Sequence, residues 1–123
     1  MQRRSRYHTE VAALDEGEWR RLIAHYLGLC ALIDTQVGRI LDHLRAAGEL
    51  DRTIVVFTSD HGDMLGSHCL NEKGHYLHYE ETLRVPLLVR HPDMRGGQRV
   101  APFVSLIDLL PTLAQLGGQC HRP

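Results

Sequence analysis

Two short apolar runs constrain the fold more than any other feature of this sequence. Residues 53–58 read TIVVFT and residues 84–90 read RVPLLVR, and neither run alternates apolar with polar residues. A strand without alternation is buried on both faces, which is typical of the interior of a parallel sheet covered by helices. The sequence therefore predicts an α/β fold with two buried, parallel strands.

A long amphipathic helix is expected before the first strand. Apolar residues recur three or four positions apart from Trp19 to Leu44, which is the helical period. Gly48 stands where a left-handed C-cap glycine would end this helix, and Arg45 suits the negative end of the helix dipole.

A second helix is expected near the end of the chain. Residues 104–118 read VSLIDLLPTLAQLGG, in which Ser105 or Asp108 can cap a helix that Gly117 and Gly118 end. The order helix, strand, long loop, strand, helix corresponds to half of a doubly wound α/β layer. Because two strands make a marginal sheet, we expect further strands and helices to complete it.

Composition and charge argue against several classes of function. The net charge of −1 leaves no electrostatic footprint for nucleic acid or an anionic membrane. No apolar run approaches the roughly 18 residues of a membrane span, and no apolar block of a secretory signal follows the basic start MQRRSR. Cys30, Cys69 and Cys120 have no zinc or disulfide spacing. We expect neither nucleic acid nor a membrane as a partner, and the compartment stays open.

The loop between the two strands holds the residues best suited to chemistry. Asp60 and His61 follow the first strand, and ligands of open α/β sheets bind beyond the carboxyl ends of strands. A carboxylate and an imidazole both bind divalent cations, and Gly62 lets the backbone turn sharply enough for the two side chains to converge. On these residues alone, a turn-forming Asp60 beside a solvated His61 stays open as the alternative.

A longer stretch carries a family resemblance. Residues 53–93, TIVVFTSDHGDMLGSHCLNEKGHYLHYEETLRVPLLVRHPD, resemble the C-terminal portion of the catalytic domain of sulfatases, in the alkaline-phosphatase-like superfamily. Residues 25–48 and 104–118 resemble the helices on either side, so the resemblance covers about 19–118. It implies a partial alkaline-phosphatase-like fold, with a long helix, parallel buried strands, a long metal-site loop and a C-terminal helix. Residues 1–123 would then be a single fragment of that domain.

The resemblance also implies roles for three residues. Asp60 and His61 would coordinate one divalent cation, which in sulfatases is usually calcium. Manganese, magnesium or zinc are alternatives, because the imidazole of His61 stands where many relatives have an Asn and is a softer ligand than an amide oxygen. Lys73 would contact the sulfate or the leaving oxygen, where a cation and an ammonium group stabilise developing negative charge. Without the resemblance, Lys73 would be read as a solvated loop lysine.

Other polar residues of the loop receive weaker assignments. His68 either approaches substrate or bonds to the backbone, and Asp63 is expected to support the metal loop without ligating the ion. Arg84 is expected to pair with Glu80 or Glu81. Three further histidines have no spacing typical of metal ligands: His75, His78 and His91.

The nucleophile expected of this family is absent from the sequence. Sulfatases carry it in a Cys-x-Pro-Ser-Arg or Ser-x-Pro-Ser-Arg signature, where the Cys or Ser becomes formylglycine, and none of the three cysteines lies in that pattern. The paired acidic ligands and a catalytic His of the family's upstream part are also missing. We therefore expect the missing N-terminal half of the same domain to be a partner, and the chain alone to be inactive.

These observations predict a fragment of a sulfatase-like hydrolase that cleaves sulfate monoesters with a divalent metal. One alternative is a fragment of a phosphomonoesterase or phosphonate monoester hydrolase, because the SDHGD segment at 59–63 also suits those relatives. The other alternative is a noncatalytic structural or binding remnant.

Overall fold

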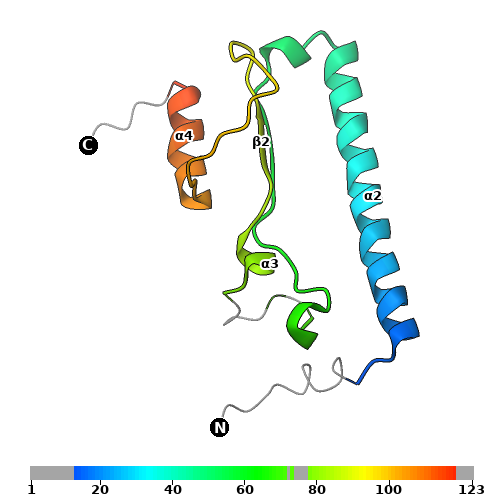
Figure 1. The fold of residues 1–123 in the computed structure, drawn as a ribbon. Helices are drawn as coiled ribbons and strands as arrows, with labels where there is room; N and C mark the ends of the chain where they lie inside the picture. The colour runs from blue at the N-terminus through cyan, green and yellow to red at the C-terminus, as the bar shows by residue number, and fades with distance from the viewer. Residues whose placement is uncertain (1–12, 72, 74–77, 119–123) are drawn as a thin grey trace. The chain divides into compact units, whose positions relative to one another are not determined.

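The computed structural model describes residues 13–71, 73 and 78–118 of the chain. The chain divides into two compact units, Met1–Asp93 and Met94–Pro123. The described part is a mixed α/β fragment, in which the first unit holds a long helix and two strands and the second holds a short helix (Figure 1).

Helix α2, Glu16–Ala46, is 31 residues long and opens the described part of the first unit. At its start the backbone N–H of Glu18 donates to Asp15 Oδ1 at 2.8 Å and that of Asp15 donates to Glu18 Oε2 at 2.9 Å, a reciprocal capping box. At its end Gly48 has a φ of 70°. The predicted helix and its left-handed terminal glycine are confirmed, whereas the Asp15 cap was not foreseen.

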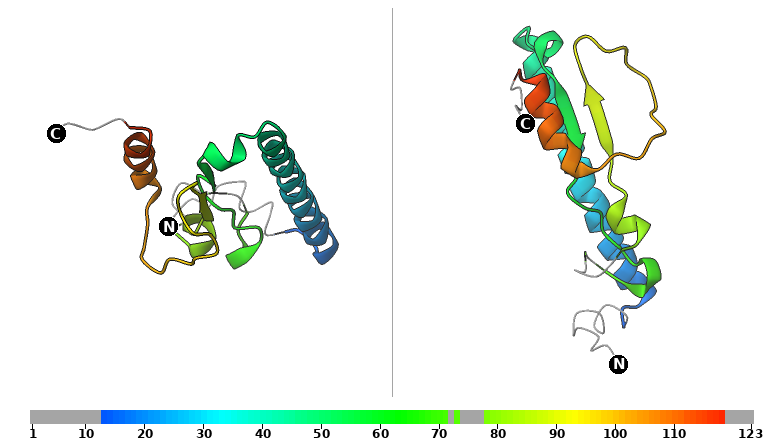
Figure 2. Two further views of the ribbon diagram at one scale, coloured as in Figure 1. Left: turned by 90° about the horizontal axis from the view of Figure 1, so that it is seen from above. Right: turned by 90° about the vertical axis from the view of Figure 1, so that its left-hand side faces the viewer.

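Strands β1, Val55–Thr58, and β2, Leu87–Arg90, pair antiparallel, with Val55 opposite Arg90 and Thr58 opposite Leu87. The two arrows accordingly run in opposite directions (Figure 2). The prediction of parallel strands is wrong. Parallel strands are joined by a long crossover connection, usually a helix. Here the two described arms of the connection, residues 59–71 and 78–84, lie side by side.

The connection contains only short helices among its described residues. These are the 3₁₀ turn η2, Ser67–Cys69, and α3, Glu80–Leu83. The backbone N–H of Gly62 donates to the carbonyl oxygen of Thr82 at 2.9 Å, which extends the antiparallel alignment beyond the strands.

The predicted burial of the strands is also wrong for this chain. Leu88 is 60% exposed and Val89 is 53% exposed. Among the residues that the structure describes, the buried ones are Met64, at 1% exposure, and Thr82, at 6%. The unbroken apolar pattern of the strands is therefore typical of a sheet whose faces are covered. The elements that the structure describes do not cover these strands.

Arg90 ties the end of β2 to the 3₁₀ turn η1, Leu50–Arg52. Its guanidinium donates to the carbonyl oxygens of Leu50 and Thr53, and its Nη2 lies 2.7 Å from Asp51 Oδ1. These bonds satisfy the turn's carbonyl groups and fix the connection between α2 and β1.

The second unit contains the 3₁₀ turn η3, Leu106–Asp108, followed by α4, Leu109–Leu116. The backbone N–H of Ser105 donates to Asp108 Oδ2 at 3.2 Å, and Gly118 has a φ of 79°. The predicted final helix is confirmed. Within the described residues, no helix combines the length and apolarity that a membrane crossing requires.

Candidate metal centre

Asp60 and His61 turn toward each other immediately after β1. Asp60 Oδ2 lies 3.4 Å from His61 Nε2, and the backbone N–H of His61 donates to Asp60 Oδ1 at 2.9 Å. Two ligands of one cation, each about 2.0–2.5 Å from it, stand roughly 3–3.5 Å apart. The carboxylate oxygen and the imidazole nitrogen therefore have the separation of neighbouring ligands of one ion.

The imidazole of His61 is oriented by its own backbone. Its Nδ1 lies 2.8 Å from the carbonyl oxygen of Gly62. Because a carbonyl oxygen only accepts hydrogen bonds, Nδ1 carries a proton, and in the neutral ring Nε2 keeps its lone pair for the side facing Asp60. Metal-binding histidines commonly have their second nitrogen held in this way.

The electrostatics around Asp60 favour the ionised carboxylate. Local desolvation raises the pKa of Asp60, but the hydrogen bond from the His61 backbone and the electrostatic interactions with His61 and Lys73 lower it more, so the net pKa lies below its usual value. The carboxylate is thus charged at neutral pH, as a metal ligand must be. The ammonium group of Lys73 is one of the charges that lower the pKa of Asp60.

Gly62 is required for space and not for a turn. Its φ lies outside the left-handed region, in contrast to the expectation from the sequence. A Cβ at this position would lie 1.9 Å from the carbonyl oxygen of Glu81. Any other residue at position 62 would push the two arms of the loop apart.

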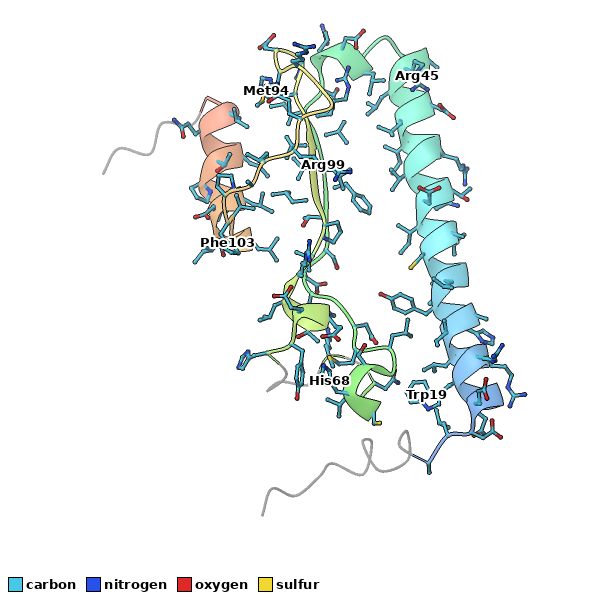
Figure 3. The ribbon with its side chains drawn as sticks, in the orientation of Figure 1. Trp19, Arg45, His68, Met94, Arg99 and Phe103 are labelled. Carbon is cyan, nitrogen blue, oxygen red and sulfur yellow. The ribbon has the colours of Figure 1, made fainter. Side chains whose placement is uncertain are left out.

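The loop continues into a tight turn that contacts α2. Gly66 has a φ of 95°, and a Cβ there would lie 3.1 Å from the ring of Trp19. Met64, the most buried described side chain, stands at the start of this turn. Figure 3 shows Trp19 on the first turns of α2 and His68 on the loop. The Asp60–Gly62 segment is therefore supported by a small packed cluster, and sequence periodicity gave no sign of it.

The weaker loop assignments have mixed outcomes. Among the described residues the His68 ring bonds no backbone group; it stacks on Tyr79, with ring centroids 4.3 Å apart, and an approach to substrate stays a prediction. Asp63 Oδ1 accepts from the backbone N–H of Leu65 at 2.8 Å, which stabilises the loop. Arg84 makes no ion pair with Glu80 or Glu81, which departs from the expectation.

Asp60 and His61 are the two candidate ligands that the structure brings together. Among the described residues no group of three or more His, Cys, Asp and Glu side chains could hold a metal ion. His78 and His91 are described and join no such group, whereas His75 lies outside the described residues. A cation bound here would take its further ligands from elsewhere.

His61 also lines one end of a cleft of about 870 Å³ between α2 and the two strands. Polar side chains at that end include Asp63, Glu81 and Arg84. The remaining walls are mainly apolar and include Tyr26, Ile33, Val37, Leu41, Phe57 and Leu88. His61, but not Asp60, thus lines a cleft whose walls are mainly apolar.

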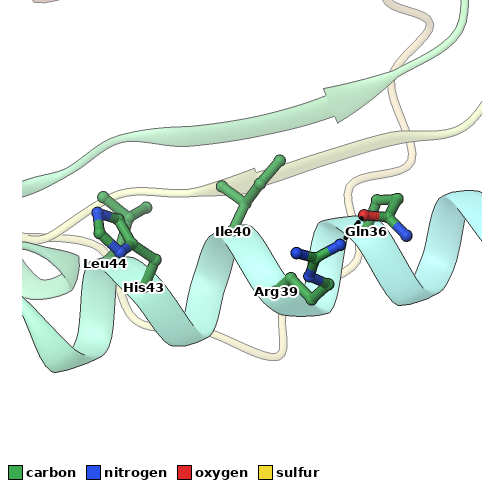
Figure 4. A pocket seen from close by; sticks show the side chains of 5 residues that line it. All are labelled: Gln36, Arg39, Ile40, His43 and Leu44. Atoms are coloured by element: carbon green, nitrogen blue, oxygen red, sulfur yellow. Dashed lines mark hydrogen bonds between the residues drawn. The ribbon is translucent and has the colours of Figure 1, made fainter.

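A second hollow lies along α2 and measures about 590 Å³. Its lining includes Ile40, His43 and Leu44, and Arg39 Nη1 donates to Gln36 Oε1 there at 2.8 Å (Figure 4). With one imidazole and no carboxylate, this hollow lacks the ligands of a second metal centre.

Comparison with known proteins identifies the family. Residues 2–119 match the family described as Sulfatase. The chain belongs to the sulfatase family. Sulfatases typically use a divalent cation, and the converging carboxylate and imidazole of this sulfatase chain fit one.

Its relatives include proteins named as sulfatases and one named as a member of the alkaline phosphatase superfamily. The chain is 40% identical over 114 residues to the multifunctional alkaline phosphatase superfamily protein PehA of Trinickia caryophylli, covering 90% of the chain and 22% of that protein. It is 39% identical over 108 residues to arylsulfatase K of Xenopus laevis, covering 88% and 20%. It is 35% identical over 107 residues to an N-acetylglucosamine-6-O-sulfatase of Bacteroides thetaiotaomicron, covering 86% and 19%. This sulfatase chain thus spans about a fifth of the length of these relatives.

Proposed function

We propose that this chain is the C-terminal metal-binding segment of a sulfatase catalytic domain, and that the parent enzyme hydrolyses sulfate monoesters. The observation that carries the proposal is the 3.4 Å approach of Asp60 Oδ2 to His61 Nε2, with His61 Nδ1 held by the Gly62 carbonyl. Family membership supports the choice of sulfate esters as the substrate class.

In this proposal each residue has a distinct task. Asp60 and His61 hold the cation, and Gly62 fixes the imidazole through its carbonyl oxygen. A divalent cation bound there supplies Lewis acidity to a sulfate oxygen. Lys73 is exposed and its charge acts on Asp60, and in this proposal its ammonium group stabilises the negative charge that develops on the departing ester oxygen.

The chain alone is proposed to be inactive. It contains neither Cys-x-Pro-Ser-Arg nor Ser-x-Pro-Ser-Arg, so the formylglycine nucleophile of this family has no position here. The partner in catalysis is then the N-terminal half of a sulfatase domain, which supplies the nucleophile and the remaining ligands. Calcium is the expected ion, with manganese, magnesium or zinc as alternatives.

A chimera tests this proposal. The matched segment of Xenopus laevis arylsulfatase K is replaced by this chain, and hydrolysis of an aryl sulfate is measured with and without added calcium or manganese. We expect activity that chelation abolishes, that Asp60→Ala and Lys73→Ala reduce at least about 100-fold, and that the exposed control Arg20→Ala retains. A folded chimera that is as active with Asp60→Ala as without it would contradict the proposal.

A phosphate or phosphonate ester is the second candidate substrate, because the chain is 40% identical to a protein named as a multifunctional member of the alkaline phosphatase superfamily. An aryl phosphate assayed beside the aryl sulfate separates the two. A higher kcat/KM for the phosphate in the chimera, relative to the unmodified arylsulfatase, would favour this second candidate.

The noncatalytic alternative makes a different prediction for the isolated chain. A noncatalytic remnant that binds no cation should show no rise in its unfolding temperature when manganese is added. A chain that binds manganese in its folded state should unfold at a higher temperature. The same titration on Asp60→Ala tests whether any rise comes from the proposed site.

A further inference from the structure

We infer that His68 is a positioning residue for the metal pair, acting by holding together the two arms of the loop, residues 59–71 and 78–84. This inference rests on the proposed metal site. His68 is five positions from Lys73 and bonds neither Asp60 nor His61, so its role has to pass through its neighbours.

His68 makes two contacts with the opposite arm. Its ring stacks on Tyr79 with centroids 4.3 Å apart and planes inclined by 19°. Its Nε2 lies 3.6 Å from Glu81 Oε1. One imidazole therefore joins the first arm to two side chains of the second.

The second arm in turn holds the backbone of Gly62, whose carbonyl oxygen orients the His61 imidazole. The carbonyl oxygen of Glu81 occupies the space where a Cβ of residue 62 would stand, and the carbonyl oxygen of Thr82 accepts from the Gly62 N–H at 2.9 Å. The carbonyl oxygen of Gly62 then accepts from His61 Nδ1. The contacts run from His68 through Glu81 to Gly62, and from Gly62 to the imidazole that faces Asp60.

The backbone at His68 is consistent with this role. Its φ of 56° and ψ of 25° lie in the left-handed region, and the adjacent Cys69 has a φ of 55°. Non-glycine residues occupy this region at an energetic cost and persist there when surrounding contacts hold them. Among the residues that the structure describes, the stack on Tyr79 and the approach to Glu81 are the side-chain contacts that hold His68.

Three variants separate the two contacts. His68→Ala removes both contacts, and His68→Phe keeps a ring to stack on Tyr79 but loses the contact with Glu81. Glu81→Gln removes only the charge of the side chain that His68 approaches. His25→Ala, an exposed histidine on α2, is the matched control. Each variant is made in the full chain.

The first measurement is Mn²⁺ affinity by calorimetry, with urea unfolding of the metal-free chain in parallel. We expect His68→Ala to weaken Mn²⁺ binding by about 10-fold or more, as losing an outer contact of a metal ligand does. We expect His68→Phe and Glu81→Gln to fall between His68→Ala and the unmodified chain. His25→Ala should match the unmodified chain. An unchanged Mn²⁺ affinity in His68→Ala would overturn the inference.

The second measurement needs no metal and so separates this inference from the proposed function. Amide hydrogen exchange of Gly62 reports its bond to Thr82, while exchange in the middle of α2 reports general stability. We expect His68→Ala to speed exchange at Gly62 at least about tenfold and to leave α2 unchanged. Equal acceleration in both regions, or none at Gly62, would overturn the positioning role. Failure of the unmodified chain to bind Mn²⁺ would instead count against the proposed metal site.

Discussion

The loop after β1 is polar in sequence but contains buried residues, whereas the apolar stripe of α2 is exposed. The loop is rich in polar residues, yet it contains Met64 and Thr82, which are 1% and 6% exposed, and its two arms contact each other closely. Helix α2 carries a long apolar stripe, yet Ile40 is 61% exposed. The difference indicates that the loop makes its own contacts, whereas the stripe needs cover that the described elements do not provide.

The buried side chains thus lie in the loop, and the exposed apolar side chain of Ile40 lies on the helix. A polar loop built from local contacts keeps its geometry when the chain covers only about a fifth of its relatives' length.

Replacement of Met64 by Ala is expected to have the largest effect on stability. Because Met64 is fully enclosed, its truncation should lower the free energy of unfolding by about 2–5 kcal/mol, as measured by urea titration followed by circular dichroism. Ile40→Ala is the matched control, with an expected loss of less than about 1 kcal/mol because its side chain is largely exposed. Equal losses in the two variants would show that the loop is not the packed region.

Gly62→Ala should follow in size. A Cβ 1.9 Å from the Glu81 carbonyl oxygen forces the arms apart, at a cost of about 1–3 kcal/mol, and should also weaken Mn²⁺ binding. Gly28→Ala on α2 meets no atom within 4 Å and should stabilise the chain by about 0.5–1 kcal/mol. If Gly62→Ala bound Mn²⁺ as the unmodified chain does, close approach of the arms would not be needed for the metal pair.

Asp15→Ala removes the cap of α2. Losing the carboxylate that accepts from Glu18 should lower the free energy of unfolding by about 1 kcal/mol, without changing Mn²⁺ affinity. The measurement pairs urea unfolding with calorimetry. A loss of metal affinity in this variant would show that the helix and the loop are coupled more strongly than the comparison implies.

Leu88→Ser tests the uncovered strand. Because Leu88 is 60% exposed, the substitution should change the free energy of unfolding by less than about 0.5 kcal/mol. It should also reduce binding of a fluorescent dye that reports exposed apolar surface. A cost above 2 kcal/mol would show that β2 is covered in solution, contrary to this account.

Local signals allowed part of the fold to be predicted. Gly48 marks the end of α2 because a left-handed residue ends a helix whatever surrounds it, and Ser105 with Asp108 mark the start of the final helix for a similar reason. Strand direction was not predictable in this way. The apolar runs at β1 and β2 report only that their faces suit cover, and pairing depends on the path of the long connection.

The candidate site was likewise predictable only in part from the sequence. The adjacency of Asp60 and His61 after a strand was enough to predict a converging pair, and the structure brings their side chains to 3.4 Å. Gly62 is required because the carbonyl oxygen of Glu81 lies close to it, and His68 stacks on Tyr79. Both partners lie further along the chain, on the second arm of the loop. Sequence spacing inside a long loop does not determine such contacts, because the loop has no regular period.

The most direct test of the central claim observes the His61 ring nitrogens by NMR while a diamagnetic ion, Zn²⁺ or Cd²⁺, is added to the chain. We predict that Nε2 shifts as a metal ligand in a one-to-one complex while Nδ1 stays protonated and bonded to the Gly62 carbonyl, and that Asp60→Ala abolishes the change. An unchanged Nε2 signal, or metal binding through Nδ1, would contradict the claim that Asp60 and His61 hold one cation together.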